Sequence, residues 1–274
     1  MNCPVCGSGN PHEAQFCSSC GVPLGSQGTI VPLEASAGKF VPRDVSGLVQ
    51  ETFRVYRGGF KSFLPIALVP QVPFIPLAFV SGNEITATVI TAFAFSFVLS
   101  ALAGGAMVCA VSHQYLDRPI KVGDCFGRAW ARVLSLVLST LAFSLAIIGA
   151  VITIIGIPVA IYLGTTWFFF TQSIMLERKG PMASLWHSGE LVKGGFWRVL
   201  GIVFMIGATW LVPVLAVSVL FENANPVLGE LAVTAILTAL APILWIGAIL
   251  VYYDLRIRKD NYTIENLAQE MGEA

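Results

Sequence analysis

Long apolar runs separated by short polar connectors make up most of the chain after residue 60. An α-helix needs about 20 apolar residues to cross the hydrocarbon core of a bilayer. Runs of that length predict six membrane-spanning helices, near residues 60–80, 85–112, 133–155, 157–176, 197–221 and 227–253. The pattern therefore predicts an all-α integral membrane protein whose six-span domain covers residues 44–259.

Two parts of this pattern contain helix-breaking residues. Residues 133–176 are too long for one crossing, and Gly156 and Pro158 near their middle predict a turn between two spans. The first run carries four prolines, Pro65, Pro70, Pro73 and Pro76. Because an interior proline removes a backbone donor, this span is either a kinked, packed helix or a broken helix of the kind that forms substrate sites in transporters.

The basic residues lie on one side of the predicted spans. None of the sixteen Lys and Arg residues falls in the connectors 81–84 and 222–226 or in the turn at 154–158. Short cytoplasmic loops are enriched in Lys and Arg. We therefore expect a multi-pass protein of a prokaryotic cytoplasmic membrane with both termini in the cytoplasm. The first thirty residues show no signal peptide, which agrees with this orientation.

The N-terminus carries four of the six cysteines as two Cys-x-x-Cys pairs, Cys3, Cys6, Cys17 and Cys20. Four thiolates at this spacing can hold one tetrahedral zinc ion, and iron is also compatible with them. Two disulfides are the alternative, but they need an oxidising compartment. We therefore expect a structural Zn²⁺ ribbon over residues 1–21. The Gly-, Pro- and Ser-rich residues 22–43 predict a flexible linker.

Amphipathic stretches precede three of the apolar runs and predict cytoplasmic interfacial helices. Two of these stretches lead into similar motifs, RGGFK at 57–61 and KGGFW at 193–197. Helices with aromatic and basic residues on opposite faces lie naturally in the headgroup zone, although ordinary cytoplasmic loops can show the same pattern. The candidate lipid- or partner-contacting residues are Arg57, Phe60, Trp130, Trp186, Trp197, Arg198, Arg256 and Arg258. Residues 260–274 predict a short amphipathic cytoplasmic tail, and Asp254 and Arg258 are spaced to pair on one helix face.

Composition and motifs argue against several functions. The net charge is zero, so we expect no nucleic-acid partner. We find no phosphate-binding loop, nucleophile elbow or paired carboxylates within a span, so we expect a non-catalytic protein. His12, His113 and His187 show no nearby metal-type ligand, and we expect Cys109 to be a small buried apolar residue.

Three segments carry a resemblance to a known family. They are FRVYRGGFKSFLP, SLWHSGELVKGGFWRVL and YYDLRIRKDNYTIENLAQEM. The membrane part resembles prokaryotic multi-spanning proteins grouped with the glycerophosphoryl diester phosphodiesterase membrane domain, and the N-terminus resembles the short zinc ribbons that precede many prokaryotic membrane proteins. The resemblance implies phosphodiesterase activity only where a separate catalytic domain is present. This sequence contains no such domain, so we do not expect the activity.

These observations favour one function and leave two alternatives. The first hypothesis is a non-catalytic membrane protein whose zinc ribbon recruits or senses a cytosolic partner, with interfacial helices that organise the membrane surface. The second is a transporter or lipid-handling protein that uses the proline-rich first span. The third is a membrane subunit of a separately encoded phosphodiesterase. The sequence does not indicate an oligomeric state.

Overall fold

The computed structural model describes residues 2–3, 6–11, 14, 17–19, 40–79, 85–153, 155–221 and 226–272. In this part of the chain the regular structure is helical, apart from one isolated bridge between Asn2 and Gly9. The elements are α1 (Val45–Leu68), the 3₁₀ helix η2 (Val69–Phe79), α2 (Ile85–Tyr115), α3 (Val122–Trp130), α4 (Val133–Val151), α5 (Gly156–Thr166), α6 (Phe170–Met175), α7 (Pro181–Val192), α8 (Phe196–Phe221), α9 (Pro226–Asp260) and α10 (Ile264–Glu270). The predicted all-α class is confirmed.

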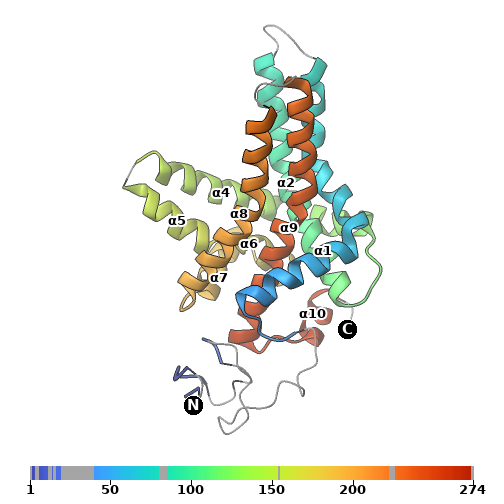
Figure 1. The fold of residues 1–274 in the computed structure, drawn as a ribbon. Helices are drawn as coiled ribbons and strands as arrows, with labels where there is room; N and C mark the ends of the chain where they lie inside the picture. Colours follow the sequence, from blue (N-terminus) through green and yellow to red (C-terminus); the bar gives the residue numbers. More distant parts are fainter. Residues whose placement is uncertain are drawn as a thin grey trace.

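A pillar of long helices forms the centre of the molecule (Figure 1). Helices α2, α8 and α9 run along the pillar, and α9 packs against α1, α2 and α8. The hairpin of α4 and α5 projects sideways from the pillar, whereas α7 and α10 lie towards its lower end (Figure 1).

Within the residues that the structure describes, four helices are long and apolar enough to cross a membrane, which indicates a membrane protein. They cover Thr86–Tyr115, Val133–Val151, Phe196–Val217 and Thr234–Asp260, and they match four of the six predicted spans. The α2 and α9 stretches are 56% and 50% buried inside the protein, but those in α4 and α8 are only 11% and 12% buried. The apolar stretches of α4 and α8 are therefore mostly exposed on the surface of the protein.

The first predicted span differs from a single helix. The chain is α-helical only to Leu68 and then continues as η2. Prolines at every third residue prevent an α-helical hydrogen-bond ladder in η2, since each lacks an N–H and clashes with the preceding turn. The Ser96 hydroxyl of α2 donates to the Pro70 carbonyl at 2.8 Å, which satisfies a backbone acceptor at this break.

The fourth predicted span, 157–176, is divided into α5 and α6. The side chain of Ser188, from α7, enters the gap between them. Its hydroxyl donates to the Thr166 carbonyl at 2.6 Å and accepts from the Phe169 N–H at 3.0 Å. A side chain inserted into the backbone ladder is a recognised cause of helix breaks.

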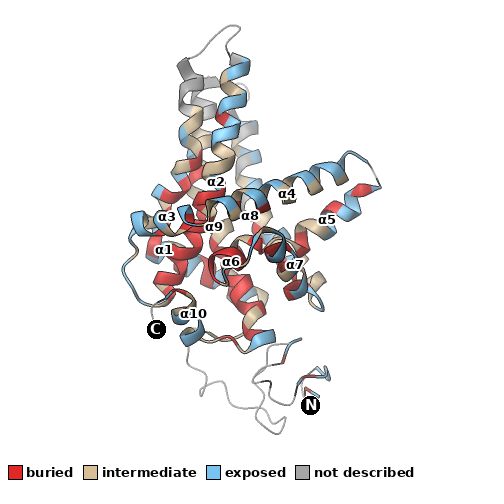
Figure 2. Ribbon diagram, turned by 180° about the vertical axis from the view of Figure 1, so that it is seen from behind, coloured by how far each residue is buried: buried red, intermediate tan, exposed pale blue. Residues whose placement is uncertain are grey.

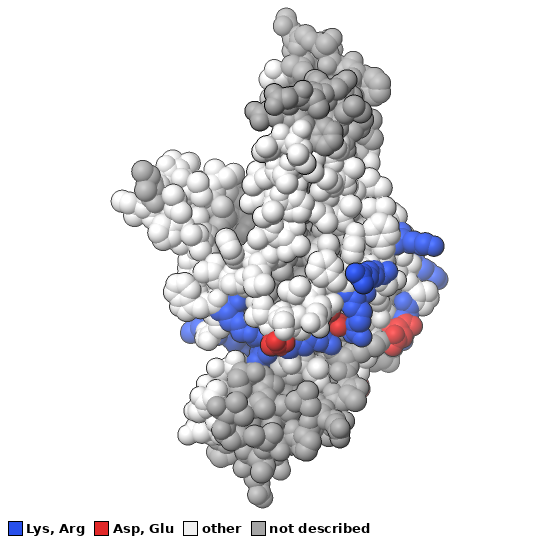
Figure 3. Space-filling view, in the orientation of Figure 1, with Lys and Arg blue, Asp and Glu red and all other residues white. Residues whose placement is uncertain are grey.

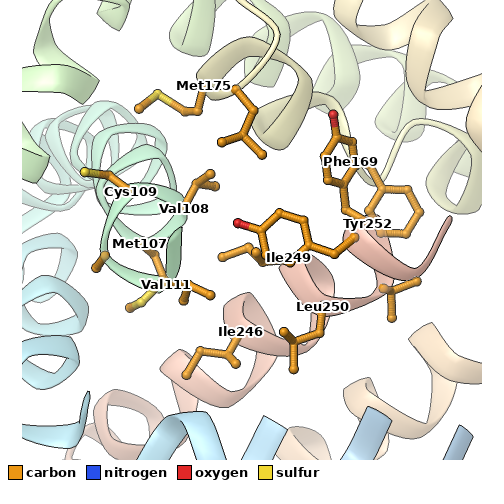
Figure 4. Close-up of a cluster of buried hydrophobic side chains, with 14 of the residues drawn as sticks. Met107, Val108, Cys109, Val111, Phe169, Met175, Ile246, Ile249, Leu250 and Tyr252 are labelled. Atoms are coloured by element: carbon orange, nitrogen blue, oxygen red, sulfur yellow. The ribbon is translucent and has the colours of Figure 1, made fainter. Parts of the chain in front are cut away.

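The core lies in the lower half of the pillar, where buried residues of α1, α2, α6 and α9 gather (Figure 2). Figure 4 shows part of it, with Val108 of α2 facing Ile249 and Tyr252 of α9. Close approach depends on Gly105, where an added Cβ would lie 2.9 Å from Leu136 Cδ1 and 3.2 Å from the Ala129 Cβ. Glycine at this position therefore allows α2 to pack directly against α3 and α4.

The two similar Gly-Gly-Phe motifs have different structural roles. The first lies inside α1, where an added Cβ at Gly58 would lie 2.6 Å from the Gln114 amide nitrogen, so it brings α1 close to α2. In the second, Gly194 has a φ of +89° and follows the end of α7. Glycine tolerates this left-handed conformation, which allows the chain to turn into α8.

Candidate functional site

Charged residues gather at one end of the molecule. Figure 3 shows Lys and Arg in a band across the lower part, with uncharged surface above it. Several acidic side chains in this band are buried and paired with basic side chains. The pairing offsets the cost of burying their charge.

Asp254 of α9 is the centre of one buried cluster. Its Oδ2 atom lies 2.9 Å from Arg258 Nε and 2.8 Å from Arg198 Nη1, and its Oδ1 accepts from the Arg43 N–H at 2.8 Å. Both guanidinium groups also donate to the Arg43 carbonyl. The predicted pair of Asp254 and Arg258 thus forms, and it fixes the end of the predicted linker, with Phe40 packed on Tyr115.

Glu177 forms the centre of a second cluster between α6 and α7. Its Oε1 atom lies 2.7 Å from His187 Nε2 and also accepts from the Tyr252 hydroxyl, while Oε2 lies 3.0 Å from Lys179 Nζ. Burial alone would raise the pKa of Glu177, but the hydrogen bonds from His187, Tyr252 and Lys179 lower it to about 2. Glu177 is therefore ionised at neutral pH and links His187 of α7 to Tyr252 of α9.

A basic cavity of about 290 Å³ opens next to this cluster. Arg128, Arg132 and Arg178 line it together with Glu270, whose carboxylate is already bound to Arg256 at 2.7 Å. Burial and then the neighbouring Arg178 lower the pKa of Arg132. Among the described residues, no carboxylate lies within ion-pair distance of Arg132 or Arg178. The cavity is therefore suited to an anionic group that accepts hydrogen bonds, such as a phosphate.

An apolar crevice of about 500 Å³ adjoins the basic cavity. It lies between α2, α4, α6, α8 and α9, and Val108 lines both hollows. The crevice includes Gln172, which is 4% exposed and whose Oε1 has no hydrogen-bond donor in the part of the chain that the structure describes. The volume of this crevice and its mostly apolar lining suit a flexible apolar chain.

The N-terminal cysteines converge as far as the structure describes them. The sulfur atoms of Cys3, Cys6 and Cys17 lie within 4.8 Å of one another, and Cys20 lies outside the described residues. Gly7, at a φ of +72°, donates its N–H to the Cys3 carbonyl at 2.9 Å, which forms a tight turn around the first pair. The Asn10 amide lies 3.5 Å from the Cys17 sulfur. These residues can hold a metal ion, because the thiolates converge and an N–H group faces one of them.

The predicted lipid- or partner-contacting residues occupy two kinds of position. Exposed side chains are those of Arg57, Phe60, Trp130, Trp186 and Trp197. Arg198, Arg256 and Arg258 are instead half-buried or buried and paired with carboxylates. No described contact tests whether the exposed residues bind lipid, and that assignment stays a prediction.

Sequence reasoning missed the main features of the basic cavity. From the sequence, Arg132 and Arg178 are only two of the sixteen basic residues whose one-sided distribution predicts orientation, and no pattern singles out Glu177. Their proximity depends on how the α3–α4 corner packs against the end of α6, a relation between residues more than forty positions apart. The only sequence feature that could have indicated this cavity was the concentration of arginines next to the predicted spans.

Comparison with known proteins finds no matching protein-family model, no matching curated protein and no matching solved structure.

Proposed function

We propose that this chain is a membrane protein that binds an anionic lipid, with the headgroup in the basic cavity and an acyl chain in the apolar crevice. The observation that supports this proposal is the shared wall at Val108, where a basic hollow adjoins an apolar one. A phospholipid has the same division between charge and hydrocarbon. In this proposal the basic end faces the cytoplasm, because short cytoplasmic loops are enriched in Lys and Arg.

Substitution of the arginines that line the basic cavity tests the lipid proposal. Arg132→Gln combined with Arg178→Gln should weaken binding of phosphatidylglycerol about 30-fold, since each arginine near an anionic headgroup contributes about 1 kcal/mol. Native mass spectrometry of the detergent-solubilised protein during a lipid titration measures this change. Phosphatidylcholine, which has no net charge, should bind weakly to the wild type and be little affected.

Two further variants separate the cavity from general surface charge. Lys121→Gln with Lys193→Gln removes two charges from exposed positions outside the cavity lining and should leave binding nearly unchanged. Gly207→Leu should reduce lipid retention because an added side chain there meets no neighbouring atom and projects into the crevice. Equal losses in the two charge variants would contradict the proposed site.

A second function is favoured by the convergent N-terminal thiols: recruitment of a cytosolic partner by a zinc-loaded module. A segment of about twenty residues has little core, so the metal would supply most of its folding energy. Cys17→Ser with Cys20→Ser should release bound partners while the membrane body stays inserted, and chelation should release the same partners. Ser19→Ala is the matched control. Affinity purification with quantitative mass spectrometry tests this, and unchanged partners in the cysteine variant would exclude the role.

A further inference from the structure

A second cluster of metal-binding side chains lies inside the helical body, far along the chain from the N-terminal cysteines. Cys109 and His113 stand one turn apart on α2, and Cys125 lies on α3. Their ligand atoms all lie within 4.8 Å of one another, and the three residues are 1%, 7% and 0% exposed. The expectation that His113 has no nearby metal-type ligand is therefore wrong: Cys109 precedes it by four residues on the same helix, and Cys125 reaches both through the packing of α3 on α2.

We propose that Cys109, His113 and Cys125 form a Zn²⁺ site. Two thiolates and one neutral imidazole are a common ligand set for zinc, which holds sulfur at about 2.3 Å and nitrogen at about 2.0 Å. Ligand atoms around a tetrahedral ion are then about 3.5–4 Å apart, so only small side-chain movements complete the site. The two thiolates cancel the charge of the dication. Neutrality favours Zn²⁺ over Cu⁺ at a buried position, because a monovalent ion would leave one uncompensated charge there.

The proposed zinc site adjoins the basic cavity. Cys109 also lines the basic cavity, and in Figure 4 its sulfur points away from the packed side chains of Ile249 and Tyr252. Three protein ligands leave a fourth position that water or an anionic group could fill. A bound ion would also join α3 to α2. Since α3 carries Arg128, the metal would hold one wall of the basic cavity in place. The zinc assignment itself does not depend on the lipid proposal.

The test must distinguish this site from the N-terminal thiols. Full-length protein with serine at positions 3, 6, 17 and 20 should retain one zinc per chain, measured by elemental mass spectrometry against protein concentration. Cys125→Ser in that background should weaken zinc binding at least about 100-fold, because loss of a ligand exceeds the usual effect of losing its supporting residues. Asp124→Asn, which changes an exposed neighbour on the same helix, is the matched control and should retain the zinc.

Cobalt binding can be measured in protein whose internal site is unchanged. This test therefore does not depend on the folding of a variant at Cys109, His113 or Cys125. Co²⁺ added to the N-terminal serine variant should give thiolate-to-cobalt charge-transfer absorption, and Cys109→Ser or Cys125→Ser should each reduce it by about half. His113→Gln should retain the thiolate absorption and change the ligand-field bands. Absence of both retained zinc and the charge-transfer absorption in the N-terminal serine variant would overturn the proposal, as would equal zinc content with and without Cys125.

Discussion

Asp254→Asn should destabilise the protein by about 3–5 kcal/mol, the usual cost of removing one partner from a buried ion pair. Asp254 is 2% exposed and Arg258 is 6% exposed, so the substitution leaves a buried guanidinium without its counter-charge. The carboxylate also accepts the Arg43 N–H, and its loss would free the segment that precedes α1. Chemical unfolding in detergent, followed by tryptophan fluorescence, measures the change.

A matched substitution exists on the same helix. Asp260 lies four residues from Arg256, as Asp254 lies four residues from Arg258, but its side chain is 45% exposed. Asp260→Asn should therefore cost less than about 1 kcal/mol. Combining Asp254→Asn with Arg258→Met should recover part of the loss, since the more deeply buried of the two unpaired guanidinium groups is then absent and only the half-buried Arg198 remains. Similar effects of the two single aspartate variants would show that the Asp254 cluster does not carry the stability assigned to it.

Acidification should destabilise the protein through Glu177, starting as the pH falls below about 4.5. The pKa of Glu177 is about 2 in the folded protein, against 4.5 for an unperturbed glutamate. Its stabilising contribution is therefore complete above the unfolded pKa and is lost as the pH falls through the folded pKa. At about 1.4 kcal/mol per pKa unit, the full effect is roughly 3 kcal/mol. Unfolding free energies measured between pH 7 and pH 2.5 follow this loss.

Glu177→Gln isolates this contribution from the other acidic groups. The variant should be less stable than the wild type at pH 7, and the difference between them should shrink as the pH approaches 2. Glu190→Gln, at an exposed position on α7, should keep the wild-type dependence between these limits. If the difference in unfolding free energy between the wild type and Glu177→Gln stayed constant with pH, ionised Glu177 would not be the stabilising group.

The Glu177 cluster also connects stability with the proposed lipid site. Arg178 follows Glu177 directly and has a φ of +57°, an uncommon conformation for a residue with a side chain. The bonds to Glu177 fix the backbone on one side of this residue. Loss of those bonds should therefore loosen Arg178, so Glu177→Gln is expected to weaken binding of phosphatidylglycerol as well as lower stability.

The sequence by itself determined the features that depend on local pattern. Continuous apolar runs predicted six spans, and among the described residues four of these coincide with helices long and apolar enough to span a membrane, because a hydrocarbon core demands both length and an internally bonded backbone. A four-residue spacing indicated the pair of Asp254 and Arg258, since such residues are neighbours on any α-helix. Two Cys-x-x-Cys pairs likewise indicated the convergence of Cys3, Cys6 and Cys17, while zinc and the role of Cys20 stay predictions.

Only the tertiary structure decided which helix faces meet. Ser188 divides α5 from α6 although it lies more than fifteen residues away, and no local signal at residues 167–169 marks the break. Cys125 joins Cys109 and His113 for the same reason, through the packing of α3 on α2. Periodicity shows which side of a helix is apolar, but it does not show which helix will cover that side. Buried polar contacts and cavities depend on that choice, and they appear only when the helices are packed.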